Sequence, residues 1–252
     1  MPRYRLLVEY HGTPFVGWQR QRDGISVQGE IEAALLRFCG EAVEVTAAGR
    51  SDAGVHATGQ VSHFDLARPF DPGRVRDALN FHLRPHPIVV RAAEQAAADF
   101  HARFSASGRA YLYRIVNRRA PLAIDRHRAW WVAMPLDAEA MAQGAVHLLG
   151  RHDFTSFRAA ACQANSPLKS LDKLTVTRAD EEIRIVARAR SFLHHQVRNM
   201  VGTLKLVGEG KWPPERVAGA LAARDRAAAG PTAPAEGLYL TGVTYGGETE
   251  GG

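Results

Sequence analysis

Hydrophobic and polar residues follow two periodicities in turn along the first third of the chain. Residues 4–10 alternate in part and are rich in β-formers, which predicts a strand. Between Ser26, a suitable N-cap, and Gly40 the apolar residues recur with helical spacing, which predicts a helix. A second helix is predicted to begin at Asp71-Pro72, where proline fits the first turn. Further strands are predicted at about 42–48, 60–65 and 87–90, giving the order β-α-β-β-α-β.

The inward positions are expected to be Val27, Ile31, Leu35 and Phe38 in the first helix, and Val75, Leu79 and either Phe81 or Leu83 in the second.

The second half repeats this succession. A helix is predicted between Asp137 and Gly150, and a longer one from Phe192 to Val207. Strands are predicted at 111–116, at about 170–178 and 182–189, and at 238–243. Each half therefore fits a split β-α-β unit of ferredoxin-like type, and the fold class is α+β.

The predicted domains follow from that repeat. The first half spans residues 1–105 and carries the acidic loop discussed below, and the second spans residues 106–245. Residues 246–252 read as a flexible tail. Two such sheets side by side would leave a cleft between the halves.

Composition limits the class of protein. The chain has 252 residues, of which 46% are hydrophobic and 23% charged, as in ordinary globular proteins. No stretch approaches the roughly 20 apolar residues that span a bilayer, so no membrane association is predicted. The N-terminus enters a strand pattern at once, without a signal-peptide core. Two cysteines, Cys39 and Cys162, are too few for a disulfide framework and favour the reducing cytoplasm.

The net charge of +6 favours an anionic partner, with nucleic acid as the leading candidate. Of the 32 basic residues 28 are arginine, a side chain that grips phosphate and stacks on bases. A GC-rich genome also inflates arginine and alanine together. The net charge is therefore the better signal.

The run GRSDAGVHATGQ, residues 49–60, places Asp52 in a loop bounded by glycines between two predicted strands. Glycines permit sharp turns and close approach of another molecule. Arg50 puts a cation near the carboxylate or near an anionic ligand. The layout suits a catalytic carboxylate at the floor of a cleft. The structural alternative is an Asx-turn, in which Asp52 binds only the amides of its own loop.

Two further segments mix aromatic and cationic residues. Residues 15–22, FVGWQRQR, suit phosphate contact and stacking, whereas the alternative is a surface loop with Trp18 in the core. Residues 100–111, FHARFSASGRAY, end at Tyr111, whose ring could stack on a base from the start of a strand. The alternative for Tyr111 is ordinary packing in a sheet.

A fourth segment is the helix predicted from Phe192. Leu193, Val197, Val201 and Leu204 would form its buried stripe. Arg198 flanks that stripe, where it could reach a buried carboxylate or simply be solvated. His194 and His195 would point about 100° apart on a helix and could not share a metal, so no metal is predicted there.

Together these segments resemble the tRNA pseudouridine synthases of the TruA type. The markers are GRSDAGVHATGQ, FVGWQRQ, HARFSASGRAYLYRI, SFLHHQVRNMVGTL and the terminal GLYL, in that order and over nearly the whole chain. Ser51 stands where many members have threonine, a conservative change.

The resemblance implies the pseudouridine synthase fold: two ferredoxin-like halves forming a mixed, mostly antiparallel central sheet flanked by helices. It implies a homodimer that binds tRNA and isomerises uridine to pseudouridine at positions 38 to 40 of the anticodon arm, without cofactor or metal. By the same resemblance Asp52 is the catalytic carboxylate, and Arg50 extrudes or holds the target nucleotide. Tyr111 stacks on the uracil and Arg198 pairs with Asp52.

Two other functions remain open from the residues. One is a non-catalytic RNA-binding protein built of tandem ferredoxin-like modules, although no RNP1-type pattern occurs on the predicted strands. The other is a hydrolase that acts on a nucleoside, which normally needs two carboxylates around the scissile bond. Only Asp52 lies in a convincing site. Release of tritium from C5-labelled uridine would distinguish isomerisation from binding alone, and free uracil would indicate hydrolysis.

Overall fold

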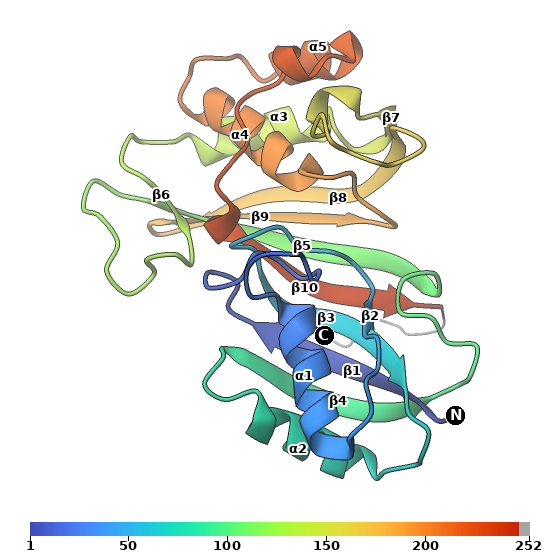
Figure 1. The fold of residues 1–252 in the computed structure, drawn as a ribbon. Helices are drawn as coiled ribbons and strands as arrows, with labels where there is room; N and C mark the ends of the chain where they lie inside the picture. Colours follow the sequence, from blue (N-terminus) through green and yellow to red (C-terminus); the bar gives the residue numbers. More distant parts are fainter. Residues whose placement is uncertain (247–252) are drawn as a thin grey trace. The chain divides into compact units, whose positions relative to one another are not determined.

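The computed structural model describes residues 1–246 and divides into two compact units (Figure 1). The first unit consists of Met1–Ser107 and the chain from Tyr239 onward, and the second of Gly108–Leu238. The predicted α+β class is confirmed, since helices and mostly antiparallel strands make up both units. Of the tail predicted at 246–252, residues 247–252 lie outside the described residues.

The first unit is a sheet with two helices. Its strands lie in the order β4-β1-β3-β10, with β2 paired to β3. Strand β1 is antiparallel to both of its neighbours, whereas β10 runs parallel to β3. The elements are β1 (Arg3–Tyr10), α1 (Val27–Cys39), β2 (Thr46–Ala47), β3 (His56–Asp65), α2 (Pro72–His82), β4 (Ile88–Ala96) and β10 (Leu238–Tyr245).

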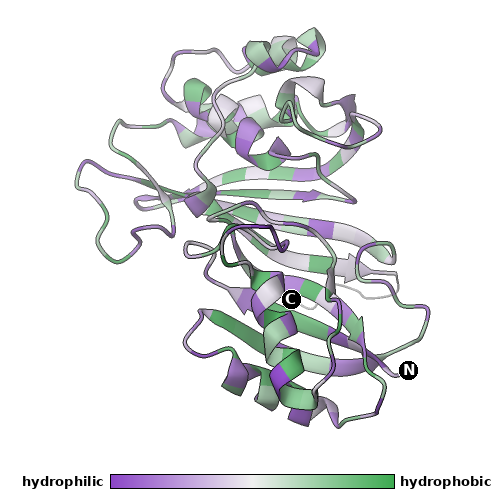
Figure 2. Cartoon of the chain, viewed as in Figure 1, coloured by the Kyte–Doolittle hydropathy of each residue, from purple (hydrophilic) through white to green (hydrophobic). Residues whose placement is uncertain are grey.

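Both helices of this unit begin where their sequence signals predict, and α1 also ends at its predicted residue. The Ser26 side chain accepts a hydrogen bond from the Gly29 amide, and Gly40 ends α1 in the left-handed conformation with φ 77°. Asp71 caps α2 through the Arg74 amide. Leu83 is buried and Phe81 is 67% exposed, which decides the inward position left open at this helix. Figure 2 shows that α1 and α2 carry hydrophilic as well as hydrophobic residues, as expected for helices that bury one face.

The strands of the first unit differ from prediction at their ends. The strand expected at 42–48 is reduced to Thr46–Ala47, because the Glu32 carboxylate of α1 accepts the Val45 amide at 3.0 Å. The Gln28 amide donates to the Val45 carbonyl at 3.2 Å, so both backbone groups of that residue are already bonded to helix side chains. Strand β3 begins at His56 rather than near residue 60. The last strand, expected within the second half, pairs with β3 and belongs mainly to the first unit.

The second unit contains the antiparallel order β5-β9-β8-β7, with β6 parallel to β5. The strands predicted at about 170–178 and 182–189 are confirmed as an antiparallel pair, joined by a turn at Asp180, which has φ 52°. The elements are β5 (Ala106–Asn117), β6 (Trp130–Val132), α3 (Ala138–Val146), β7 (Gly150–Asp153), β8 (Leu168–Ala179), β9 (Glu182–Ala189), α4 (Gln196–Gly208) and α5 (Arg216–Ala223), with short 3-10 turns at Thr155–Phe157, Arg226–Ala228 and Ala235–Gly237.

Helix α4 starts four residues later than predicted. The Leu193 amide donates to the Gln196 side chain at 2.8 Å, and His195 adopts φ 62°, which no right-handed helix contains. The predicted inward stripe is nonetheless buried: Leu193, Val197, Val201 and Leu204 are each at most 4% exposed. No helix among residues 1–246 is long and apolar enough to cross a membrane.

Candidate active site

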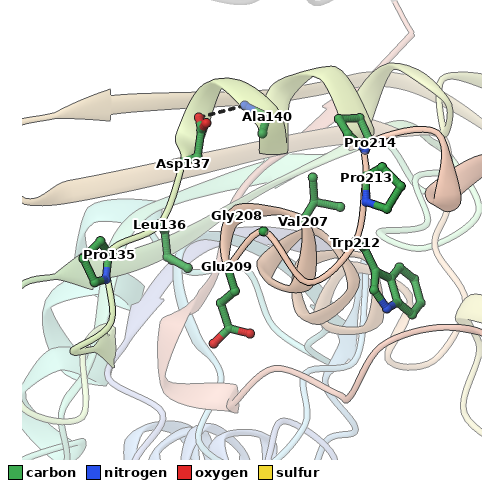
Figure 3. Close-up of a pocket in the computed structure, with 11 residues that line it drawn as sticks. Pro135, Leu136, Asp137, Ala140, Val207, Gly208, Glu209, Trp212, Pro213 and Pro214 are labelled. Atoms are coloured by element: carbon green, nitrogen blue, oxygen red, sulfur yellow. Dashed lines mark hydrogen bonds between the residues drawn. The ribbon is translucent and has the colours of Figure 1, made fainter.

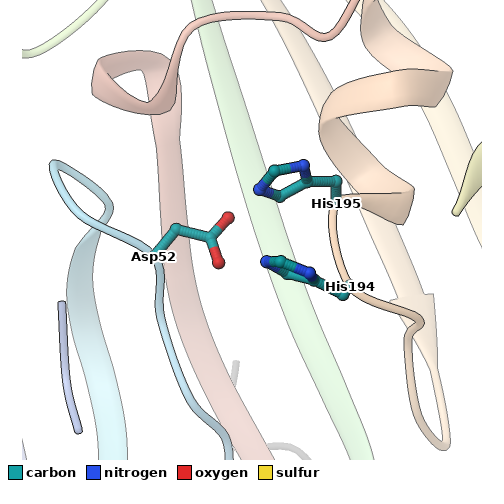
Figure 4. Close-up of side chains that lie close together, drawn as sticks. All are labelled: Asp52, His194 and His195. Carbon is teal, nitrogen blue, oxygen red and sulfur yellow. The ribbon is translucent and has the colours of Figure 1, made fainter. Parts of the chain in front are cut away.

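The acidic loop, Gly49–Val55, connects β2 to β3 and carries Asp52 (Figure 4). Asp52 forms an isolated antiparallel bridge with Gly17, and the Trp18 amide donates to the Ser51 carbonyl at 3.1 Å. The Val55 amide donates to the Asp52 carbonyl at 3.2 Å and closes a tight turn. The loop is therefore held by main-chain hydrogen bonds at the residue before Asp52 and at Asp52 itself.

Glycine is required where the segment after β1 meets this loop. A Cβ atom added at Gly12 would lie 2.0 Å from the Val55 carbonyl oxygen. Gly17 has φ 116°, and a Cβ there would lie 2.5 Å from the Ser51 carbonyl oxygen. The two backbones approach so closely that no side chain fits between them.

Aromatic and histidine side chains support the end of the loop. The Gly12 amide donates to Nδ1 of His56 at 2.9 Å, so this nitrogen carries no proton. The His56 ring stacks on Tyr239 of β10 with centroids 4.6 Å apart. His56 is 1% exposed, and it links the end of the loop to the segment after β1 through Gly12 and to β10 through Tyr239.

Asp52 is half-buried and Arg50 is exposed, so both predicted residues of this loop remain partly accessible. The aromatic residues of the neighbouring loop are buried, since Phe15 and Trp18 are only 3% and 2% exposed. The alternative that placed Trp18 in the core is confirmed, and this ring is not available for base stacking.

Tyr111 lies in β5 of the second unit and is half-buried. Its ring meets Phe192 edge-on, with centroids 5.1 Å apart and planes at 89°. Tyr113, two residues later on the same strand face, is completely buried and donates its hydroxyl to the Pro234 carbonyl at 2.8 Å. Burial raises the pKa of Tyr113 well above its usual value, so that hydroxyl stays protonated. Tyr111 is thus the accessible tyrosine of β5, and Phe192 is a ring partner that the sequence pattern did not reveal.

Arg198 is half-buried in the first turn of α4. Its Nε donates to the Ala233 carbonyl at 2.8 Å, and the Ala233 amide donates back to the Arg198 carbonyl at 3.1 Å. The alternative of a freely solvated arginine is wrong, because Nε of the guanidinium group is hydrogen-bonded to the main chain at Ala233.

His194 and His195 precede α4 instead of lying on it (Figure 4). Their rings lie 4.0 Å apart between centroids, tilted by 44°. The His194 carbonyl accepts the Ala159 amide at 2.9 Å. The predicted 100° separation of the two side chains is wrong, because helical geometry does not apply to this segment.

A groove of about 680 Å³ lies in the second unit between the start of α3 and the end of α4 (Figure 3). Its two carboxylates have structural partners. The Asp137 carboxylate caps α3 through the Glu139 and Ala140 amides at 2.9 Å each, and Glu209 forms ion pairs with Lys205 and Lys211. None of the four predicted site residues lines this groove.

The family model described as tRNA pseudouridine synthase matches residues 6–105 and 145–246. A protein named tRNA pseudouridine synthase A from Paramagnetospirillum magneticum is 70% identical over 97% of this chain and 96% of its own length. Proteins of the same name from Rhodospirillum centenum and Azorhizobium caulinodans are each 62% identical over 97% of this chain, and over 100% and 95% of their own lengths. A solved structure titled "Crystal Structure of a Cbf5-Nop10-Gar1 Complex" aligns with a TM-score of 0.32 at 9% identity, over 80% of this chain and 54% of the other, which is too weak to carry an argument.

Proposed function

The chain belongs to the family of tRNA pseudouridine synthases, and from this premise we propose that it isomerises uridine to pseudouridine in the anticodon arm of tRNA, at positions 38 to 40. The net charge of +6 suits a polyanionic substrate. We also propose that the protein acts in the cytoplasm and forms a homodimer. Light scattering of the purified chain tests the dimer.

The reaction exchanges one glycosidic bond for another. The N1–C1′ bond breaks, the uracil turns, and C5 bonds to C1′; the C5 proton then leaves to solvent and N1 gains one. A uridine in a stem is not accessible until it is turned out of the helix, at a cost of a few kcal/mol. Stacking on an aromatic ring returns about 1–3 kcal/mol. The half-buried ring of Tyr111 is proposed to supply that stacking.

Asp52 is the proposed catalytic carboxylate, and the observation that carries this role is the construction of its loop. Hydrogen bonds to the main chain immediately before Asp52 and at Asp52 itself hold the residue while leaving it half-buried. A reacting group needs such preorganisation, because small displacements lower rates steeply. As an ionised group Asp52 would attack C1′ or C6, or remove the proton at C2′, and the three routes remain open.

The two arginines have complementary proposed roles. Arg50, exposed beside Asp52, is proposed to hold or replace the extruded nucleotide. Arg198, anchored on Ala233, is proposed to pair with Asp52 through their opposite charges.

Asp52→Asn tests the assignment. The variant removes the negative charge with little change in volume, so it should bind tRNA nearly normally and form no pseudouridine. Tritium release from tRNA that carries C5-labelled uridine measures the reaction directly. Substantial release by the variant would refute the catalytic role of Asp52. Free uracil among the wild-type products would indicate hydrolysis instead.

A further inference from the structure

Two buried polar side chains hold the main chain on either side of Arg50 in the acidic loop. Tyr10 at the end of β1 is 3% exposed, and Gln60 in β3 is completely buried. The Gln60 amide donates to the Gly49 carbonyl at 2.8 Å. The Tyr10 and Ser51 hydroxyls share a hydrogen bond of 2.8 Å. Gly49 and Ser51, the residues directly before and after Arg50, are therefore each hydrogen-bonded to a side chain of a core strand.

The two hydrogen bonds come from buried side chains of two core strands, Tyr10 in β1 and Gln60 in β3. Burial raises the pKa of Tyr10 to about 12, which keeps the hydroxyl protonated over the working pH range. The support is neutral throughout and does not titrate with the substrate-facing charges.

The loop needs such support because glycines lie at Gly49 and Gly54, the latter with φ 78°. Glycine gives a backbone many accessible conformations, and each must be excluded for a carboxylate to keep one position. Asp52 directly follows Ser51, so a shift of the Ser51 hydroxyl moves the reacting group with it. A displacement near 1 Å costs about 100-fold in rate.

We propose that Tyr10 and Gln60 are positioning residues for uridine isomerisation, which act through Ser51 and Gly49 to fix the carboxylate of Asp52. This inference rests on the proposed function of Asp52. Both hydrogen bonds, Tyr10 to Ser51 and Gln60 to Gly49, lie entirely within the first unit.

Tyr10→Phe removes the hydroxyl and keeps the buried ring. The single-turnover rate of pseudouridine formation on an unmodified tRNA transcript is expected to fall about tenfold or more. The Kd for the same transcript should stay within about twofold, because Tyr10 is buried and touches no substrate. Gln60→Met, which keeps the side-chain length, should lower the rate comparably.

Tyr4→Phe is the matched control. Tyr4 lies on the same strand, is 1% exposed, and its hydroxyl both donates to the Phe70 carbonyl at 2.8 Å and accepts the Phe70 amide at 2.6 Å. This variant loses at least as much hydrogen bonding, so its unfolding midpoint should fall as far as that of Tyr10→Phe. Its rate should remain at the wild-type value. An equal rate loss in Tyr4→Phe would overturn the positioning role in favour of general destabilisation.

A double-mutant cycle shows whether Tyr10 acts through Ser51. Ser51→Ala should lower the rate about tenfold, and Ser51→Thr, which keeps the hydroxyl, should preserve it. Tyr10→Phe should cause no further loss in the Ser51→Ala background. Multiplying losses would overturn the proposed connection.

Asp52→Asn distinguishes the two levels of the proposal. If Asp52→Asn is inactive and Tyr10→Phe has the wild-type rate, the positioning role fails and the catalytic assignment stands. If Asp52→Asn is active, the catalytic assignment itself fails.

Discussion

Arg50 in the acidic loop and Arg198 in α4 are proposed to serve one reaction, yet their surroundings differ. Arg50 is exposed, and its side chain makes no hydrogen bond or ion pair with any other residue of the described range 1–246. Arg198 is half-buried, with Nε bonded to the Ala233 carbonyl. An exposed arginine keeps its rotamer freedom until a ligand orders it, whereas a fixed one has already lost that freedom on folding. The comparison is consistent with the proposed roles, an adaptable contact for Arg50 and a fixed position for Arg198.

Arg114 in β5 supplies a third, structural case. It forms ion pairs with Glu182 at 2.8 Å and with Asp125 at 3.2 Å. Arg184 also contacts Glu182, at 3.0 Å. These guanidinium groups have protein carboxylates as partners, so they contribute to the unit that holds them and leave little capacity for RNA phosphate. Charge alone therefore does not identify a substrate-binding arginine.

Among the variants that test this comparison of arginines, the largest effect is expected for Arg198→Lys. Lysine keeps the charge but lacks the Nε donor and the planar fork that fix this side chain. We expect kcat/KM to fall about 100-fold, roughly 2.7 kcal/mol of transition-state stabilisation. The free energy of unfolding should fall by about 1 kcal/mol, since the Ala233 carbonyl loses its donor. Single-turnover kinetics and denaturant unfolding measure the two quantities.

Arg226→Lys is the control for that variant. Arg226 is also half-buried and donates to the Gly230 carbonyl at 2.9 Å and to the Thr232 hydroxyl at 3.2 Å. Its replacement should lower stability at least as much without lowering the rate. A wild-type rate in Arg198→Lys would break the comparison, because fixed geometry would then be irrelevant to catalysis.

A smaller effect is expected for Arg50→Ala. The rate should fall about tenfold, roughly 1.4 kcal/mol, because a substrate contact is lost. The free energy of unfolding should change by less than about 0.5 kcal/mol, since the side chain is exposed.

If Arg50 binds phosphate, the dependence of log Kd on log salt concentration should become shallower by about one unit in Arg50→Ala. Arg74→Ala, at an exposed position of α2, controls for a general loss of charge. An unchanged rate and salt dependence in Arg50→Ala would remove this residue from the site.

The sequence predicted elements well where one face is buried and the ends carry local signals. Helix α1 begins after Ser26 and ends before Gly40 because both caps act within three or four residues. The strand expected at 42–48 fails for a non-local reason: Glu32 and Gln28 bind the backbone of Val45, and no periodicity encodes that contact. The late start of α4 has a similar cause in the bond from Leu193 to Gln196.

The candidate site shows the same limit. Resemblance in sequence singled out Asp52, but the ties that hold its loop come from residues whose patterns indicate only a core strand. Tyr10 ends an alternating segment, and it meets Ser51 only because β1 pairs with β3 in one register. A hydrogen bond across 41 positions of sequence leaves no periodic signal. Its partners become visible only when the fold brings them together.

The smallest effect concerns the structural arginine and is expected for Glu182→Gln. Hydrogen bonding from Arg114 is the first cause that lowers the pKa of Glu182, to about 2 from a usual 4.5. The pKa of Glu182 is lower in the folded than in the unfolded protein. The contribution of its ionised carboxylate to folding stability is therefore fully present above about pH 4.5 and is lost as the pH falls toward 2. The side chain is 20% exposed and solvent screens the pair, so we expect a loss of only about 1 kcal/mol at pH 7.

Denaturant unfolding at pH 7 and at pH 3 tests this sign, because the difference between wild type and Glu182→Gln should be smaller at the lower pH. Glu181→Gln is the neighbouring control: its side chain is 58% exposed in the ion pair with Arg118, and its loss should cost less than about 0.5 kcal/mol. The isomerisation rate should be unaffected in both variants. A rate loss in Glu182→Gln would mean that the Arg114 ion pairs also serve the reaction, and the division into structural and substrate-directed arginines would have to be redrawn.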